Sequence, residues 1–272
     1  MQIGIVGLGL LGGSLAKALK KNTPHRVFGV DLDEEVVKSA LAAHAIDGTG
    51  RIEECDVVFL CLYPKAAVEY ALNNTFKACA VVTDICGVKR FVSDAIAVPL
   101  RKRGIRYVGS HPMAGREVSG FAASDADLFH GASYIITQRA DTDEDAVRVL
   151  SSLALSIGFA SVTRSTPEEH DRIIAYTSQL AHVVSNCYMR NPDALQRGFS
   201  ANSFLDLTRV AKLNPAMWAE LFMENAEYLM EDISLFIENL SQIKGALLAR
   251  DEESLRRLLK EGSDIKSKIS AD

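Results

Sequence analysis

The residue best suited to chemistry is His111, in the run Ser110-His111-Pro112-Met113-Ala114-Gly115 directly after a predicted strand, Arg106 to Gly109. In doubly wound α/β folds, ligands bind beyond the carboxyl ends of the strands, so this position predicts a histidine beside a bound ligand. An imidazole can accept a hydroxyl proton near neutral pH, which loss of hydride from a carbon bearing that hydroxyl requires. A histidine that follows a strand can equally be structural, so its position alone does not show that His111 is catalytic.

A second candidate is a glycine-rich turn between the predicted strand Ile3 to Val6 and a predicted helix, Ser14 to Lys20. A lone G-x-G-x-x-G pattern is weak evidence, but a place between strand and helix is typical of a dinucleotide site. There the first glycine permits a tight turn, the second lets the backbone approach a pyrophosphate, and the third lets helix and strand pack closely. The predicted cofactor-binding residues are therefore Gly7, Leu8, Gly9, Leu10, Leu11 and Gly12. The alternative is a merely flexible loop.

Asp31 ends the second predicted strand, where such units place the acidic residue that accepts hydrogen bonds from the adenosine ribose. Its charge would repel a 2′-phosphate, which favours NAD over NADP, although Arg26 or Lys38 could intervene. Asp31 could instead be the N-cap of the helix that begins near Asp33, or the two roles could fall to neighbouring aspartates.

The predicted secondary structure that positions these residues changes near residue 165, from alternating strands and helices to helices alone. Before it, short β-rich apolar runs alternate with helical stretches, which predicts a parallel sheet covered on both faces. Besides the two strands above, the runs are Val27 to Val30, Val57 to Leu62, Ala80 to Thr83, Tyr134 to Thr137 and Phe159 to Thr163. The prediction is an α/β fold: a Rossmann-like, doubly wound, mostly parallel sheet in residues 1–165 and an all-helical substrate and dimerisation domain in residues 166–272.

Helical periodicity dominates the second region. One helix is predicted from Pro167 to Met189, ended by Asn191-Pro192. Its polar residues Asp171, Ser178 and His182 are seven and four residues apart, which places them on one face. Each could instead be a satisfied buried hydrogen-bonding group.

Two further helices are predicted. The first carries Phe204, Leu207 and Val210, and Asn214-Pro215 closes it and opens the second. The second has apolar residues at spacings of three and four: Trp218, Leu221, Phe222, Leu229, Ile233, Phe236, Leu240, Ile243 and Leu247. A stripe this long predicts burial against another helix or another subunit.

Composition limits the class of partner. The chain has 272 residues, 48% of them hydrophobic, with a formal charge of -5, so a globular core is expected and no basic surface is available for nucleic acid or anionic membranes. Five cysteines without a C-x-x-C pair predict free thiols in a reducing compartment. The apolar start, Met1 to Ala16, is broken by glycines and does not resemble a signal peptide. We therefore expect a cytoplasmic protein that acts on a small molecule.

Four segments, taken in order, resemble the prephenate and arogenate dehydrogenase family. Gly7 to Leu19 resembles its glycine-rich start, and Ser110 to Gly115 its catalytic-loop signature. His170 to His182 resembles its interdomain helix, and Asp206 to Ala211, followed by Asn214-Pro215-Ala216-Met217-Trp218, resembles its substrate segment. The similarity covers nearly the whole chain, and four ordered motifs are more specific than any single one.

The resemblance implies roles for particular residues. His111 would polarise or deprotonate a ring hydroxyl, Arg209 would bind a substrate carboxylate, and His182 would line the same pocket. The other substrate-binding residues that it implies are Ser110, Ser178 and Trp218. Arg209 could instead pair with Asp206 three residues earlier, and Trp218 could belong to the core or to a dimer interface.

One position departs from the family. Members usually have a serine where this chain has Gly87, within Thr83-Asp84-Ile85-Cys86-Gly87-Val88-Lys89. That hydroxyl is thought to assist the catalytic histidine or the substrate. The contact is therefore missing, or it is supplied by Cys86, Thr83 or water.

The activity that the resemblance implies is NAD-dependent oxidative decarboxylation of prephenate to 4-hydroxyphenylpyruvate and carbon dioxide, in tyrosine biosynthesis. Such a reaction needs no metal. Arogenate is the alternative substrate, a dehydrogenase acting on a hydroxy acid or imine is a rival activity, and a non-catalytic NAD-sensing module is the alternative from another class. We expect a homodimer through the C-terminal helices and, because the chain ends soon after the helical domain, no appended regulatory domain.

Overall fold

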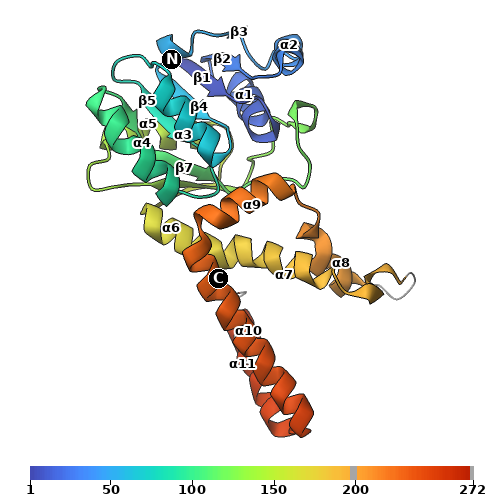
Figure 1. Ribbon diagram of the computed structural model, residues 1–272. Helices are drawn as coiled ribbons and strands as arrows, with labels where there is room; N and C mark the ends of the chain where they lie inside the picture. Colours follow the sequence, from blue (N-terminus) through green and yellow to red (C-terminus); the bar gives the residue numbers. More distant parts are fainter. Residues whose placement is uncertain (197–200, 270–272) are drawn as a thin grey trace. The chain divides into compact units, whose positions relative to one another are not determined.

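The computed structural model describes residues 1–196 and 201–269. The chain divides into two compact units, Met1–Asn225 and Ala226–Asp272 (Figure 1). All the predicted site residues lie in the first unit, which is built around two β-sheets.

The larger sheet has six strands in the order β3-β2-β1-β4-β5-β6, and every neighbouring pair is parallel. The strands are β1 (Gln2–Val6), β2 (Arg26–Val30), β3 (Gly48–Thr49), β4 (Val57–Leu60), β5 (Val81–Asp84) and β6 (Arg106–Tyr107). The order reverses between β1 and β4, and ligands bind at such a switch point in doubly wound sheets. The predicted Rossmann-like fold is confirmed.

The smaller sheet was not predicted as a separate unit. It contains β7 (Gly109–Pro112), β8 (Ser133–Thr137) and β9 (Ser161–Ser165), with β7 antiparallel and β9 parallel to β8. The predicted single strand Arg106 to Gly109 is therefore wrong. The N–H of Val108 still donates to the carbonyl of Val82 in the larger sheet, and from Gly109 onward the chain pairs with β8 instead.

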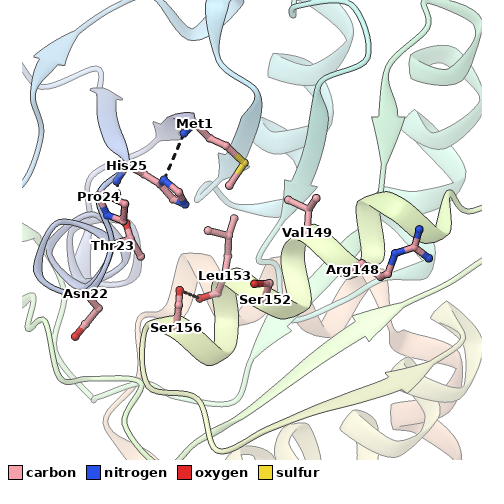
Figure 2. A pocket seen from close by; sticks show the side chains of 10 residues that line it. All are labelled: Met1, Asn22, Thr23, Pro24, His25, Arg148, Val149, Ser152, Leu153 and Ser156. Carbon is pink, nitrogen blue, oxygen red and sulfur yellow. Dashed lines mark hydrogen bonds between the residues drawn. The ribbon is translucent and has the colours of Figure 1, made fainter.

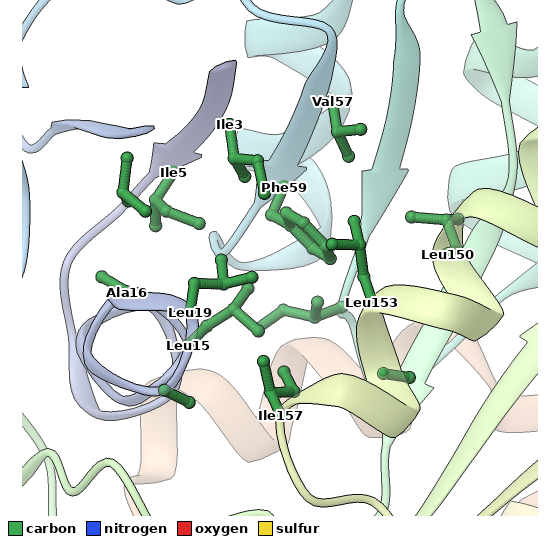
Figure 3. Close-up of a cluster of buried hydrophobic side chains, with 14 of the residues drawn as sticks. Ile3, Ile5, Leu15, Ala16, Leu19, Val57, Phe59, Leu150, Leu153 and Ile157 are labelled. Carbon is green, nitrogen blue, oxygen red and sulfur yellow. The ribbon is translucent and has the colours of Figure 1, made fainter. Parts of the chain in front are cut away.

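Helices cover both faces of the larger sheet (Figure 1). They are α1 (Leu10–Asn22), α2 (Glu34–Ala42), α3 (Pro64–Asn73), α4 (Arg90–Lys102) and α5 (Glu144–Ser156). Alternate residues of one strand enter different cores: Phe59 packs with α1 and α5, whereas Val58 and Leu60 pack with α3 and α4. Figure 3 shows the first core, where Leu15 and Leu19 of α1 meet Leu153 and Ile157 at the end of α5.

The rest of the first unit is helical. It contains α6 (Pro167–Ile174), a π-helical segment (Ala175–Leu180), α7 (Ala181–Tyr188), α8 (Asn202–Thr208) and α9 (Pro215–Glu224). Short 3₁₀ turns occupy Ile52–Glu54, Phe121–Ala123, Pro192–Leu195 and Arg209–Ala211. The predicted helix Pro167 to Met189 is thus helical nearly throughout, but it is not a regular α-helix.

The predicted long helix after Asn214-Pro215 is wrong in one respect, because it is interrupted at Asn225. The backbone there (φ -127°, ψ 24°) leaves the helical region. The side-chain amide of Asn225 donates to the carbonyl of Asp171 at 2.8 Å and to Oε1 of Gln179 at 2.9 Å. Such tertiary bonds compete with continuation of the helix.

The second unit contains α10 (Ala226–Ala249) and α11 (Glu252–Ile269), which pack on each other. Several of their large apolar side chains are exposed: Met230, Leu235, Ile237, Leu240, Leu247, Leu248, Leu259, Ile265 and Ile269. Within residues 1–196 and 201–269, no helix combines the length and the apolar character that crossing a membrane requires.

Candidate active site

The glycine turn joins β1 to α1 at the switch point of the larger sheet. Gly7 has φ +89°, and a Cβ there would lie 2.5 Å from the carbonyl oxygen of Cys61. A Cβ on Gly12 would overlap the carbonyl oxygen of Gly7, whereas Gly9 has open space around its Cβ position. Gly7 and Gly12 are therefore required by the fold, and Gly9 leaves room for a ligand to approach the backbone.

The start of α1 can hold an anion. The N-cap is Gly9, no side chain caps the helix, and no acidic residue stands in its first turn. The N–H groups of a first turn lack intrahelical acceptors and lie at the positive end of the helix dipole. Leu10, Leu11 and Gly12 therefore present N–H groups of the kind that bind a pyrophosphate.

Asp31 lies beside this turn. Its Oδ2 accepts the N–H of Leu8 at 2.7 Å and its Oδ1 accepts the N–H of Asp33 at 3.0 Å. Asp33, not Asp31, is the N-cap of α2, through the N–H of Glu35. Each oxygen of the half-buried Asp31 keeps lone pairs for ribose hydroxyls.

The two basic residues that could bind a 2′-phosphate, Arg26 and Lys38, are not positioned to do so beside Asp31. Arg26 begins β2, whereas Asp31 follows its last residue, so the two lie at opposite ends of this strand. Lys38 forms an ion pair with Glu35 at 2.7 Å. The residues around Asp31 therefore fit a dinucleotide without a 2′-phosphate.

His111 lies inside β7 rather than in a loop after a strand, with Ile135 of β8 as its partner. Its Nδ1 is 2.9 Å from Nε2 of His170, and Nδ1 of His170 is 2.8 Å from Oδ1 of Asp171. We call His111, His170 and Asp171 the histidine relay. It joins a strand of the smaller sheet to α6, across 59 residues of sequence.

The partners fix the tautomers of both rings. The Asp171 carboxylate accepts the N–H of Lys89 at 2.7 Å and the N–H of Arg90 at 2.8 Å, so Nδ1 of His170 must donate to it. Nε2 of a neutral His170 then accepts, and Nδ1 of His111 must donate. Nε2 of His111 therefore carries a lone pair, which has no hydrogen-bond donor among the residues that the structure describes and can accept a hydroxyl proton.

Burial keeps these imidazoles uncharged. Desolvation, and then the neighbouring His170 and Lys89, hold the pKa of His111 well below its usual value. Desolvation also lowers the pKa of His170, although the hydrogen bond to Asp171 opposes it. A neutral His111 is the form that a proton acceptor requires.

Asp171, Ser178 and His182, which regular helical spacing places on one face, have different neighbours in the structure. The π-helical segment changes the spacing between Asp171 and His182. Asp171 is fully buried against the start of α4, and Ser178 is only half-buried. The carbonyl of Ser178 accepts Nδ1–H of His182 at 2.9 Å, so Nε2 of a neutral His182 is an acceptor.

His182 belongs to a second group of predicted residues. Its ring stacks on Trp218 of α9 with centroids 3.8 Å apart. Desolvation lowers the pKa of His182, and the charges of Glu117 and Arg209 act on it in opposite directions. Arg209 forms an ion pair with Glu117 at 2.5 Å, and not the predicted alternative pair with Asp206. The four residues therefore lie near one another.

Two predicted contacts find no support in this geometry. Ser110 is fully buried, and its hydroxyl donates to the carbonyl of Asp84 at 2.8 Å and accepts from Tyr134 at 2.7 Å. Arg209 is bound to Glu117 from the loop after β7 and is two-thirds exposed, with 67% of its side chain accessible. Ser110 thus supports the strand, and convergence of Arg209 and His111 on one ligand stays a prediction.

The candidates for replacing the family serine also face inward. The hydroxyl of Thr83 is 2.9 Å from that of Ser110, and the thiol of Cys86 donates to the carbonyl of Leu62 at 3.4 Å. Gly87 is half-buried, and a Cβ there would lie 3.5 Å from Leu221. The polar groups of Thr83 and Cys86 are therefore engaged within the protein, and which group replaces the missing hydroxyl stays open.

A cavity of about 390 Å³ lies elsewhere, at the amino ends of β1 and β2 (Figure 2). It is lined by Met1, Asn22, Thr23, Pro24, His25, Arg148, Val149, Ser152, Leu153 and Ser156. The glycine turn follows the carboxyl end of β1, so this cavity is at the opposite edge of the sheet from the dinucleotide site. None of the predicted site residues lines it.

The sequence placed Asp171 on a polar helix face and His170 in a segment that resembles the family, but it assigned no site role to either of them or to Glu117. The adjacent pair His170-Asp171 in the first turns of a helix was a usable signal, because neighbouring titratable groups in a buried place are candidates for a site. Glu117 carried no comparable signal.

A parallel sheet with a dinucleotide turn and a neutral, oriented imidazole defines the class of dinucleotide-binding oxidoreductases. Two family models match the chain: "Prephenate dehydrogenase, nucleotide-binding domain" over residues 15–163 and "Prephenate dehydrogenase, dimerization domain" over residues 166–261. The chain belongs to the prephenate dehydrogenase family.

Individual relatives are similar over nearly the whole chain. The prephenate dehydrogenase of Bacillus subtilis is 31% identical over 96% of this chain and 74% of its own length. The cyclohexadienyl dehydrogenase of Zymomonas mobilis is 30% identical over 100% of this chain and 97% of its own.

Solved structures show the same likeness. The prephenate dehydrogenase of Aquifex aeolicus, crystallised with hydroxyphenyl propionate and NAD+, superposes with a TM-score of 0.87 at 30% identity, covering 99% of this chain and 98% of its own. The arogenate dehydrogenase of Synechocystis gives 0.83 at 25% identity, covering 99% and 100%.

Proposed function

We propose that this chain is an NAD-dependent dehydrogenase that converts prephenate to 4-hydroxyphenylpyruvate and carbon dioxide in tyrosine biosynthesis. The observation that carries the proposal is the free Nε2 of a neutral His111, held by the histidine relay. Membership of the prephenate dehydrogenase family and the NAD+ in the Aquifex aeolicus enzyme support it.

Residues of the glycine turn would hold NAD. The free N–H groups at the start of α1 would bind its pyrophosphate, and Asp31 would accept the hydroxyls of its adenosine ribose. Bound NAD would supply the acceptor for the hydride that leaves C4 of the substrate.

The chain's own residues would orient the substrate and handle one proton. Prephenate carries a hydroxyl on C4 and a carboxylate on C1, so loss of hydride from C4 lets loss of carbon dioxide form an aromatic ring. Nε2 of His111 would draw the hydroxyl proton toward itself as the C4–O bond gains double-bond character. The phenol product keeps a hydroxyl, so that proton returns to oxygen and no net proton is stored on the enzyme.

The relay would stabilise the charge that this transfer places on His111. When Nε2 gains proton density, Nδ1–H donates more strongly to His170. His170 donates in turn to the Asp171 carboxylate, whose negative charge favours a positive ring. Asp171 is fully buried, so water screens this effect little.

Arg209, His182, Ser178 and Trp218 are the residues we propose for the substrate side chain and its carboxylate. A guanidinium suits a carboxylate because it donates two parallel hydrogen bonds. In the structure Glu117 takes that place, so a substrate carboxylate would have to displace Glu117 from Arg209.

Steady-state kinetics test the proposal. We expect reduction of NAD with prephenate, followed by the absorbance of the reduced nicotinamide, and weaker or no reduction of NADP. A preference for arogenate would change the substrate but leave the chemistry. Binding of NAD without reduction in the presence of either compound would refute the proposal in favour of a sensing module.

We also propose a homodimer formed through the C-terminal helices and a division into residues 1–165 for the dinucleotide and 166–272 for substrate and dimerisation. The name of the second matching family model and the exposed apolar residues of α10 and α11 support the dimer. Light scattering on the purified chain checks it, and a monomeric mass at micromolar concentration would contradict it. A cytoplasmic location, in line with the five free cysteines, stays our prediction.

A further inference from the structure

A fully buried lysine lies behind the histidine relay. Lys89 immediately precedes α4 and has no exposed surface, and it is among the largest completely buried side chains of the described residues. Burying an ammonium is costly unless it is paired and hydrogen-bonded. Such a group in a dehydrogenase core needs a reason beyond packing.

The ammonium of Lys89 has two buried polar partners. It forms an ion pair with Asp84, which is also fully buried, and donates to the carbonyl of Ser110 at 2.6 Å. Asp84 also accepts Tyr107 Oη–H at 2.7 Å and the N–H of Cys86 at 3.0 Å. A buried ion pair is weak evidence for stability, because apolar residues of similar volume often do as well.

Lys89 contacts both ends of the relay. Its main-chain N–H donates to Oδ1 of Asp171, the same oxygen that accepts from His170. Its ammonium holds the carbonyl of Ser110, which directly precedes His111 on β7. One residue therefore ties the strand that carries one imidazole to the helix that carries the other.

We propose that Lys89 is a positioning residue for the dehydrogenase reaction: it fixes the two ends of the histidine relay, and its buried positive charge keeps a proton off both imidazoles. The proposal rests on the proposed function for its kinetic consequence, but its physical content concerns only the relay.

The balance of charge around the relay explains why the ammonium matters. Two carboxylates raise the pKa of His170, Asp171 from α6 and Asp84 from β5, whereas the ammonium of Lys89 lowers the pKa of both imidazoles. Tyr107 of β6 and Tyr134 of β8 stay neutral, since burial raises their pKa. Without Lys89, the carboxylates would favour a proton on His170. A protonated His170 would donate from Nε2 to Nδ1 of His111, so His111 would carry its own proton on Nε2 and lose its acceptor there.

The test compares pH profiles of kcat/KM for Lys89→Met, the double variant Lys89→Met with Asp84→Asn, and Lys102→Met. Lys102 is an exposed lysine at the far end of the same helix, so its substitution is the matched control. We expect Lys89→Met to raise, by about one pH unit, the pH below which kcat/KM falls, because a nearby positive charge is removed. The double variant should recover most of that shift, and the control should show none.

An equal loss of activity at every pH in Lys89→Met, with no shift in the pH at which kcat/KM falls, would mean a merely structural role and would overturn the proposal. Nitrogen-15 NMR of the histidine side chains gives a second readout that needs neither substrate nor a folded Lys89 variant. In the unaltered protein, with the two signals assigned by their loss in His111→Asn and His170→Asn, both rings should be neutral with the proton on Nδ1 at pH 7. A protonated ring there would also overturn the proposal, whereas neutral rings with no turnover of prephenate would count against the proposed substrate alone.

Discussion

Replacing Asp171 with asparagine should separate the two tasks of this carboxylate. It accepts the N–H groups of Lys89 and Arg90 at the start of α4, and it accepts Nδ1–H of His170. An amide has the same shape but only one acceptor oxygen. One of these three buried donors, or more, must therefore face an NH₂ group.

The magnitude follows from the two ways in which the amide can be placed. With the oxygen toward Lys89 and His170, the N–H of Arg90 loses its acceptor, which costs about 1–3 kcal/mol and lowers Tm by about 2–4 °C per kcal/mol. With the oxygen toward Arg90, His170 must turn its lone pair to the amide and donate from Nε2. His111 is then forced to carry its proton on Nε2, and the acceptor for the hydroxyl proton disappears.

We therefore expect Asp171→Asn to lower kcat by roughly 10² to 10⁴, the usual contribution of a general base. NAD affinity, measured by fluorescence titration, should change little, because the dinucleotide residues lie at β1 and β2. Asp143→Asn is the matched control, since Asp143 caps α5 through the N–H of Ala146 at 2.8 Å away from the relay. If Asp171→Asn turned over as fast as Asp143→Asn, the relay would play no part in catalysis.

Three further predictions concern single side chains. His111→Asn should reduce kcat by roughly 10² to 10⁴ with NAD affinity retained, and near-normal turnover would exclude His111 as the proton acceptor. Arg209→Ala should raise KM for prephenate more than it lowers kcat, whereas Glu117→Gln, which frees Arg209, should not; unchanged constants in Arg209→Ala would exclude the carboxylate contact. Gly87→Ser should fold normally, because its Cβ meets Leu221 at ordinary contact distance, and should be more active than Gly87→Ala. Equal rates for those two variants would mean that the added hydroxyl does not reach the reaction.

The dinucleotide half of the site was predictable because its signals are local. The spacing of Gly7, Gly9 and Gly12 fixes a turn whose geometry depends on a few neighbouring atoms, and Asp31 directly follows the adjacent strand. The parallel sheet followed in the same way from alternating apolar runs. The short β3, the break at Val108 and the separate smaller sheet were not predicted, since short strands and the sheet they join depend on pairing with distant partners.

The relay was not predictable, because tertiary contacts create it. Helical spacing grouped Asp171 with Ser178 and His182, but that argument assumes a regular α-helix, and the π-helical segment removes the assumption. His111 reaches His170 only because β7 leaves the larger sheet and pairs with β8. No sequence pattern in either segment indicates that His111 and His170 are in contact.

The placement of Asp171 makes stability and reactivity depend on the same atoms. The carboxylate that fixes His170 also accepts the N–H groups at the start of α4, and α4 is the next helix after β5, the strand that ends at Asp84. α6 of the helical region therefore completes a site whose other half is built on the sheets. A substitution that loosens the start of α4 should change the orientation of His111 even where the substituted residue touches neither imidazole. For that reason a lower rate alone does not identify a residue that acts on the relay. A changed pH profile distinguishes such a residue from one that only stabilises the fold.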